Sequence, residues 1–80
     1  MDKLEILEKT RRVFRDVFDK DQLIIDRMTS SKDIEGWDSL ANINLIVAIE
    51  KEFKIKFILS ELISLDNVGA MVDLIEKKIK

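Results

Sequence analysis

Apolar residues recur every three or four positions along most of the chain, the spacing of one face of an α-helix. They do not alternate with polar residues as in a half-buried strand, and the chain contains no proline. This pattern predicts helices over residues 2–18, 38–53, 60–64 and 67–78. We therefore expect an all-α fold, a small four-helix bundle with three longer helices and one short third helix. A long loop is expected between the first and second helices.

Capping residues support these predicted boundaries. Asp38 and Asn67 precede the second and last helices, where short polar side chains accept hydrogen bonds from unpaired N–H groups. Asp2 is placed to cap the first helix, and Glu5 three residues later completes a pattern that resembles a capping box. Ser60 is the expected cap of the short third helix.

The faces of the helices predict which residues form the core. In the first helix the apolar stripe contains Leu4, Leu7, Phe14 and Phe18, widened by Ile6, Val13 and Val17. In the loop, the adjacent residues Leu23, Ile24 and Ile25 are expected to pack back onto the core.

The helix over 38–53 carries two apolar stripes instead of one. The first contains Leu45, Ile46, Ile49 and Phe53, and the second contains Leu40, Ile43 and Val47. The two stripes lie roughly 140° apart at 100° per residue. A core explains one stripe, and the other requires a further core contact, a ligand tunnel or a docking surface for a partner.

Composition narrows the class of protein. Eighty residues, 46% of them hydrophobic, are expected to form one domain, residues 1–80. The formal net charge of −2 argues against nucleic-acid binding, which requires a basic surface. The first residues do not form a secretory signal, and no apolar run approaches membrane-spanning length, so we expect a cytoplasmic protein.

Missing residue types exclude several kinds of site. The chain contains neither cysteine nor histidine, which removes thiolate metal sites, disulfides and the commonest general base. Asp19 and Asp21 begin like a calcium loop, but Ile24 stands where that loop requires glycine and Ser30 where it requires glutamate. No metal site is expected.

Residues 33–40 form a polar turn, containing Gly36, that places Ser39 at the start of the second predicted helix. A helix N-terminus presents unpaired N–H groups and a partial positive charge, which favour a phosphate. A plain helix cap at Asp38 explains the same residues, and such caps are common. A catalytic Ser39 would need a base, and the nearest lysines, Lys32 and Lys51, are expected to be solvated. We therefore do not expect an enzyme.

These residues carry a resemblance to a known family. The run Gly36-Trp37-Asp38-Ser39-Leu40, followed by Ile43, Leu45, Ile49, Glu50 and Phe53, resembles the acyl carrier protein family, which has an Asp-Ser-Leu motif at the start of its second helix. The predicted order of helices follows the same family over nearly the whole chain.

The resemblance implies a function and a set of site residues. Ser39, in the motif with Asp38 and Leu40, would be esterified with 4′-phosphopantetheine by a separate phosphopantetheinyl transferase that uses coenzyme A. The thiol of this arm would hold acyl groups as thioesters and deliver them to acyl-activating, synthase or transferase enzymes. The resemblance assigns partner docking to Leu40, Ile43, Val47 and Glu50, and the walls of an acyl groove to Ile46, Phe57 and Leu62. A monomer is expected.

The chain departs from the family where carriers of general fatty-acid synthesis place carboxylates. Ala41 and Asn44 occupy such positions, and Lys51 follows Glu50. This dilutes the charged docking surface and leaves Asp38, Glu50 and Glu61 as its acidic residues. The departures favour a specialised carrier in a lipid, polyketide or related pathway. An aminoacyl or peptidyl carrier, such as a D-alanyl carrier, and an unmodified helical adaptor of the same fold remain alternatives. Trp37 is either a feature of specialised carriers or an aromatic lid over the end of the bundle.

Overall fold

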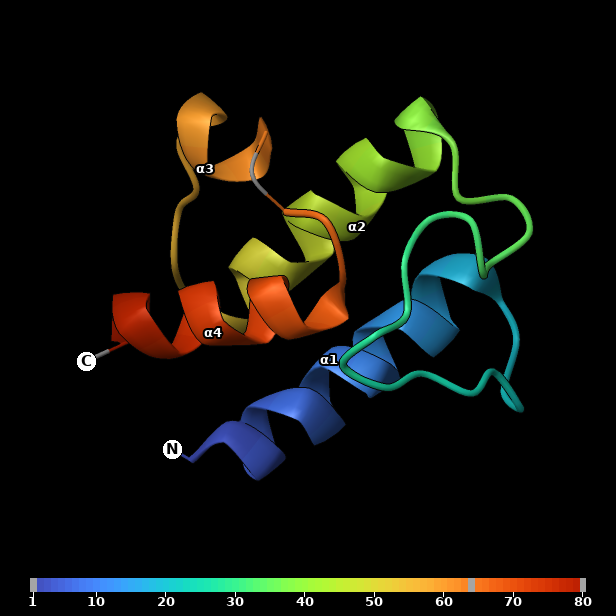
Figure 1. Ribbon diagram of the computed structural model, residues 1–80, viewed down its shortest axis with the longest axis horizontal. Helices are drawn as coiled ribbons and strands as arrows, with labels where there is room; N and C mark the ends of the chain where they lie inside the picture. The colour runs from blue at the N-terminus through green and yellow to red at the C-terminus, as the bar shows by residue number, and fades with distance from the viewer. Residues whose placement is uncertain (1, 64, 80) are drawn as a thin grey trace.

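The computed structural model describes residues 2–63 and 65–79, which form four helices connected by loops. These are α1 (Lys3–Phe18), α2 (Ser39–Phe53), α3 (Leu59–Ile63) and α4 (Val68–Ile79). No strand occurs in these two described ranges. The all-α prediction is confirmed, with three longer helices, one short helix and a long loop before α2. Figure 1 shows α1, α2 and α4 lying together, with α3 at the upper edge of the molecule.

The face of α1 that meets α2 and α4 is narrower than the sequence predicted. Ile6, Val13 and Phe14 are buried, whereas the Leu4 side chain is 67% exposed, so its assignment to the core was wrong. Leu4 lies in the first turn of α1, where the neighbouring helices do not cover it. Thr10 takes a core position because its hydroxyl donates to the Ile6 carbonyl oxygen at 2.8 Å.

The core is completed by one face of α2 and one face of α4. The predicted inner stripe of α2 is buried as expected, and α4 contributes residues at helical spacing. The buried apolar residues of these two helices are Leu45, Ile46, Ile49, Phe53, Val68, Met71, Val72 and Ile75. Burial of apolar surface against α1 is what holds the three longer helices together.

Two arginines of α1 hold the beginning of the long loop. Arg11 Nε donates to the Ile25 carbonyl oxygen at 2.6 Å, and Arg15 Nε donates to the Leu23 carbonyl oxygen at 3.1 Å. Ile25 is buried in the core, but Ile24 is 86% exposed, so the prediction that all three apolar residues pack inward was wrong for Ile24. The side chains of consecutive residues in this non-helical segment point in different directions, so only some of these three can face the core.

The middle of the loop is bound to the start of α4. Val68 N–H donates to the Thr29 carbonyl oxygen at 2.9 Å, and Gly69 N–H donates to the Arg27 carbonyl oxygen at 2.8 Å. The side chain of Asn67 accepts from Ala70 N–H at 2.8 Å, which confirms Asn67 as the cap. Loop carbonyls and a cap therefore occupy the N–H groups that a helix start leaves unpaired.

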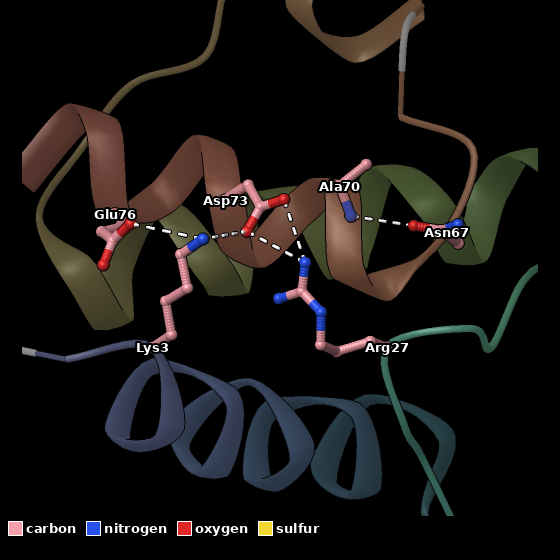
Figure 2. A network of polar contacts seen from close by, with 6 residues as sticks. All are labelled: Lys3, Arg27, Asn67, Ala70, Asp73 and Glu76. Atoms are coloured by element: carbon pink, nitrogen blue, oxygen red, sulfur yellow. Dashed lines mark hydrogen bonds and ion pairs between the residues drawn. The ribbon is translucent and has the colours of Figure 1, made fainter.

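A network of charges reinforces this junction. Figure 2 shows Arg27 of the loop and Lys3 of α1 both reaching Asp73 on α4, at 3.0 and 3.2 Å, while Lys3 also lies 3.8 Å from Glu76. Hydrogen bonds from Arg27, and then from Lys3, lower the pKa of the Asp73 carboxyl below its ordinary value. Three segments distant in the sequence thus meet at one carboxylate.

The short helix α3 has no buried residue. Ser60 lies inside α3 rather than capping it, because Ile58 N–H donates to Glu61 Oε1 at 2.9 Å and the helix begins one residue earlier than predicted. Ser64, the predicted end of this helix, lies outside the described residues. Lys78 of α4 pairs with Glu61 at 2.8 Å, and this hydrogen bond is the main cause of a lowered Glu61 pKa. The partly buried Leu62, which packs against the core, and the Lys78–Glu61 pair hold α3 in place.

The close approach at Gly69 generates a stability prediction. A Cβ atom at this position would lie 2.9 Å from the backbone oxygen of Arg27. Gly69→Ala gains about 1 kcal/mol of helix propensity but forces the loop backbone away, and such overpacking costs about 1–3 kcal/mol. We expect a net loss of stability in urea unfolding. A more stable Gly69→Ala protein would show that this approach does not constrain the fold.

Candidate functional site

Ser39 is the first residue of α2, and its side chain is exposed. The carboxylate of Asp38 caps the helix by accepting from Ala41 N–H at 2.8 Å, as predicted. No hydrogen bond engages the Ser39 hydroxyl within residues 2–63 and 65–79, so it is open to a reaction partner. The partial positive charge at the start of α2 favours a phosphate ester at this position.

The turn before Ser39 is fixed by one buried residue and one glycine. Ile34 is 4% exposed and anchors the turn in the core, and its carbonyl oxygen accepts from Trp37 N–H at 3.3 Å. Gly36 has φ +89°, which side-chain-bearing residues rarely adopt, and it needs no close approach because its surroundings are open. The turn requires glycine for its backbone conformation alone.

Trp37 closes the end of the bundle directly before the site. The Trp37 and Phe14 rings meet edge to face, with 5.2 Å between centroids and the ring planes at 84°, and the Phe18 centroid lies 6.2 Å from that of Trp37. Its Nε1–H donates to Asn42 Oδ1 at 3.0 Å. The ring is therefore fixed from both sides, and it serves as an aromatic lid, one of the two roles considered for it.

One space lies beside Ser39, and a second lies behind it and shares part of its lining. The outer one, which we call the Ser39 hollow, is an open depression of about 360 Å³ lined by Ser31, Trp37, Asp38, Ser39, Asn42, Leu65 and Asp66. The inner cavity holds about 30 Å³ and is lined by Trp37, Asn42, Ile46, Leu62, Leu65, Asn67 and Met71. Trp37, Asn42 and Leu65 belong to both linings and form the wall between them.

The sequence identified only part of these linings. Ile46 and Leu62, predicted as groove walls, do line the inner cavity. Phe57 does not: its N–H donates to Glu50 Oε2 at 2.9 Å, and its ring lies 5.9 Å from Lys78 Nζ. Asn42 could have been found as a polar residue about one turn after Ser39. Leu65 and Asp66 carry no local signal, because only the fold brings their loop to Ser39.

The predicted docking residues lie along one exposed side of α2. Leu40, Ile43 and Val47 are 69%, 60% and 45% exposed, and we call them the exposed stripe. Of the explanations open for this stripe, a further core contact does not apply. Glu50 lies at its edge, but one of its oxygens is engaged by Phe57 N–H. A docking role for these residues stays a prediction.

Within residues 2–63 and 65–79, no group of three acidic side chains is arranged to hold a metal ion. No helix in these ranges is long and apolar enough to cross a membrane.

Comparisons with known proteins agree with this geometry. Residues 8–75 match the family model described as a phosphopantetheine attachment site. The chain is similar to the solution NMR structure of a holo acyl carrier protein from Geobacter metallireducens, with 49% sequence identity and a TM-score of 0.87. The match covers 91% of this chain and 84% of that one. A search of curated proteins gave no match.

The cap at Asp38 can be tested separately from its charge. Asp38→Ala removes the acceptor for Ala41 N–H, and we expect a loss of about 1 kcal/mol in urea unfolding. Asp38→Asn retains an oxygen acceptor and should keep most of the stability. Equal losses in the two variants would mean that the negative charge, rather than the cap, stabilises the start of α2.

Proposed function

The chain belongs to the acyl carrier protein family, and on this premise we propose that Ser39 is the residue that carries its 4′-phosphopantetheine. Members of this family are carriers rather than enzymes, and they hold the prosthetic group covalently. The observation that supports Ser39 is its exposed hydroxyl, free of hydrogen bonds to the described residues, in the first turn of α2. The Ser39 hollow leaves space beside this hydroxyl for the arm.

Coenzyme A donates the phosphopantetheine group in the attachment step. The Ser39 oxygen attacks the phosphorus that bears the pantetheine, forming a phosphodiester and breaking the pyrophosphate bond. Adenosine 3′,5′-bisphosphate leaves, and the serine proton passes to a base supplied by the phosphopantetheinyl transferase, since this chain has no histidine. The attached group supplies a thiol, which the cysteine-free chain lacks.

The cargo that fits best is an acyl group of a lipid, polyketide or related biosynthetic pathway. Ile46, Leu62 and Met71 give the inner cavity apolar walls. At about 30 Å³ it holds little more than one water molecule, so an acyl chain requires it to widen. Leu62 of α3 is only partly buried, so displacing α3 to widen the cavity costs less core burial than displacing any of the three longer helices.

We further propose that the exposed stripe docks the enzymes that load and unload the arm. Three large apolar side chains on one side of α2 form a patch that the fold itself does not use. A small apolar contact suits the brief encounters that a carrier must make with several enzymes. We propose that this carrier works in the cytoplasm, together with its transferase and coenzyme A.

Intact-mass measurement tests the attachment residue. After incubation with coenzyme A and a broad-specificity phosphopantetheinyl transferase, we expect the mass to rise by one 4′-phosphopantetheinyl group. Ser39→Ala should show no increase. Ser31→Ala, which changes a second serine of the same hollow, should be modified like the wild type. An unmodified wild type, or a modified Ser39→Ala, would contradict the assignment.

A charge placed in the exposed stripe tests docking. We expect Val47→Glu to slow modification by the transferase while changing stability by no more than about 0.5 kcal/mol, because the side chain is exposed. Ile46→Glu is the contrasting variant, since it buries a charge in the core and should unfold the protein. If Val47→Glu also unfolds the protein, the stripe belongs to the core.

A further inference from the structure

The exposed stripe of α2 ends in positive charge. Lys51 continues it one turn after Val47, Lys54 follows at the C-cap, and Lys56 lies in the next loop. All three lysines are exposed, and within the described ranges none of them forms an ion pair. From Leu40 onward the exposed side of α2 therefore changes from apolar to cationic.

A surface hollow joins the lysines to the apolar part of the stripe. This lysine hollow is an open depression of about 350 Å³ lined by Val47, Glu50, Lys51, Lys54, Ile55 and Lys56. Val47 and Ile55 provide its apolar surface, and three lysines stand beside them. Such a hollow fits an apolar side chain of a partner that is flanked by carboxylates.

The nearby acids do not neutralise this end. Glu50 lines the lysine hollow and keeps its negative charge while its Oε2 accepts from Phe57 N–H, so three lysines stand around one carboxylate there. Glu61 accepts from Ile58 N–H and is paired with Lys78. Glu52 lies about 100° around the helix from Lys51, away from the stripe. Of the two acids expected to dock a partner, Glu61 is thus paired within the chain, and Glu50 is outnumbered by the lysines that line the same hollow.

The opposite end of the stripe carries the negative charge. Asp38 and Asp66 are exposed and line the Ser39 hollow, and Glu35 is exposed in the turn before Asp38. The stripe therefore runs from acidic residues at the attachment site, through three apolar residues, to lysines at the far end. Lysines near a helix C-terminus also suit its dipole, but this does not account for Lys56 or for the lysine hollow.

We propose that the C-terminal half of α2 docks an acidic patch on the enzyme that loads or unloads the arm. The inference rests on the proposed carrier function and names the chemistry of its partner. With a rise of 1.5 Å per residue, Lys51 and Lys54 lie about 18 and 22 Å along α2 from Ser39. The partner surface carries carboxylates at that distance from the opening that receives the arm, with an apolar patch between them.

Opposite charges at the two ends also fix the direction of docking. A carrier rotated by 180° on the same apolar patch would bring its lysines to the opening and its carboxylates to the acidic patch. Like charges brought together in this way disfavour the wrong orientation.

The test first identifies a partner enzyme through the reaction of its cysteine with an electrophile carried on the arm. A coenzyme A analogue with an electrophile in place of the thiol is attached to Ser39 by the transferase, and intact mass confirms the loading. The loaded protein then captures a cysteine-dependent partner from an extract of the native host, and that enzyme is purified. Its kcat/KM is measured with the holo protein and with holo variants.

Two double variants of equal net charge separate the lysine end from general charge effects. We expect Lys51→Glu/Lys54→Glu to lower kcat/KM about tenfold at low salt, and the difference to shrink towards about 0.5 M salt. The control Lys20→Glu/Lys77→Glu changes two exposed lysines that follow or end other helices. It should react like the wild type, and thermal unfolding should show both variants folded.

Several outcomes would overturn the inference. They are an unchanged kcat/KM for Lys51→Glu/Lys54→Glu, an equal loss in the control, and a faster reaction, which would mean that the partner patch is basic. Failure of a correctly loaded protein to capture any enzyme would also overturn it, while leaving the proposed attachment site intact. Failure of the loading itself, seen by mass, would instead contradict the proposed function.

Discussion

The hydrogen bonds between the long loop and the start of α4 are the constraint on which the site depends. The segment between α1 and α2 contains turns but no helix in the described ranges, and ordering such a segment costs conformational entropy. The carbonyls of Arg27 and Thr29 offset part of this cost by accepting from Gly69 and Val68 N–H. The start of α4 and the arginines of α1 both bind the loop. Ile34 can therefore reach the core, and the turn before Ser39 is held in one position.

The sequence predicted the parts of the fold that depend on local pattern. Helical spacing identified the four helices, and the caps at Asp2, Asp38 and Asn67 each accept the expected hydrogen bond. The errors arose where neighbours in space decide. Leu4 and Ile24 are apolar but uncovered, and the third helix begins before Ser60 because Glu61 turns back to Ile58.

The site was predictable to a similar extent. Its serine, cap and exposed stripe follow from residues 36–47, where the distances are set by one turn and one helix. Leu65 and Asp66 enter the Ser39 hollow from the other end of the chain, and no spacing in the sequence reports that approach. The orientation of the Glu50 side chain could not be predicted from the sequence either, because its partner is a backbone N–H seven residues away.

The aromatic lid has a spectroscopic consequence. Trp37 is the single tryptophan, and the chain contains no tyrosine. Nearly all near-ultraviolet absorption and all indole emission therefore originate two residues before the proposed attachment serine, in a ring that lies against Phe14 and is hydrogen-bonded to Asn42. This protein thus carries a native optical label at the wall between the Ser39 hollow and the inner cavity, and no other residue contributes indole emission.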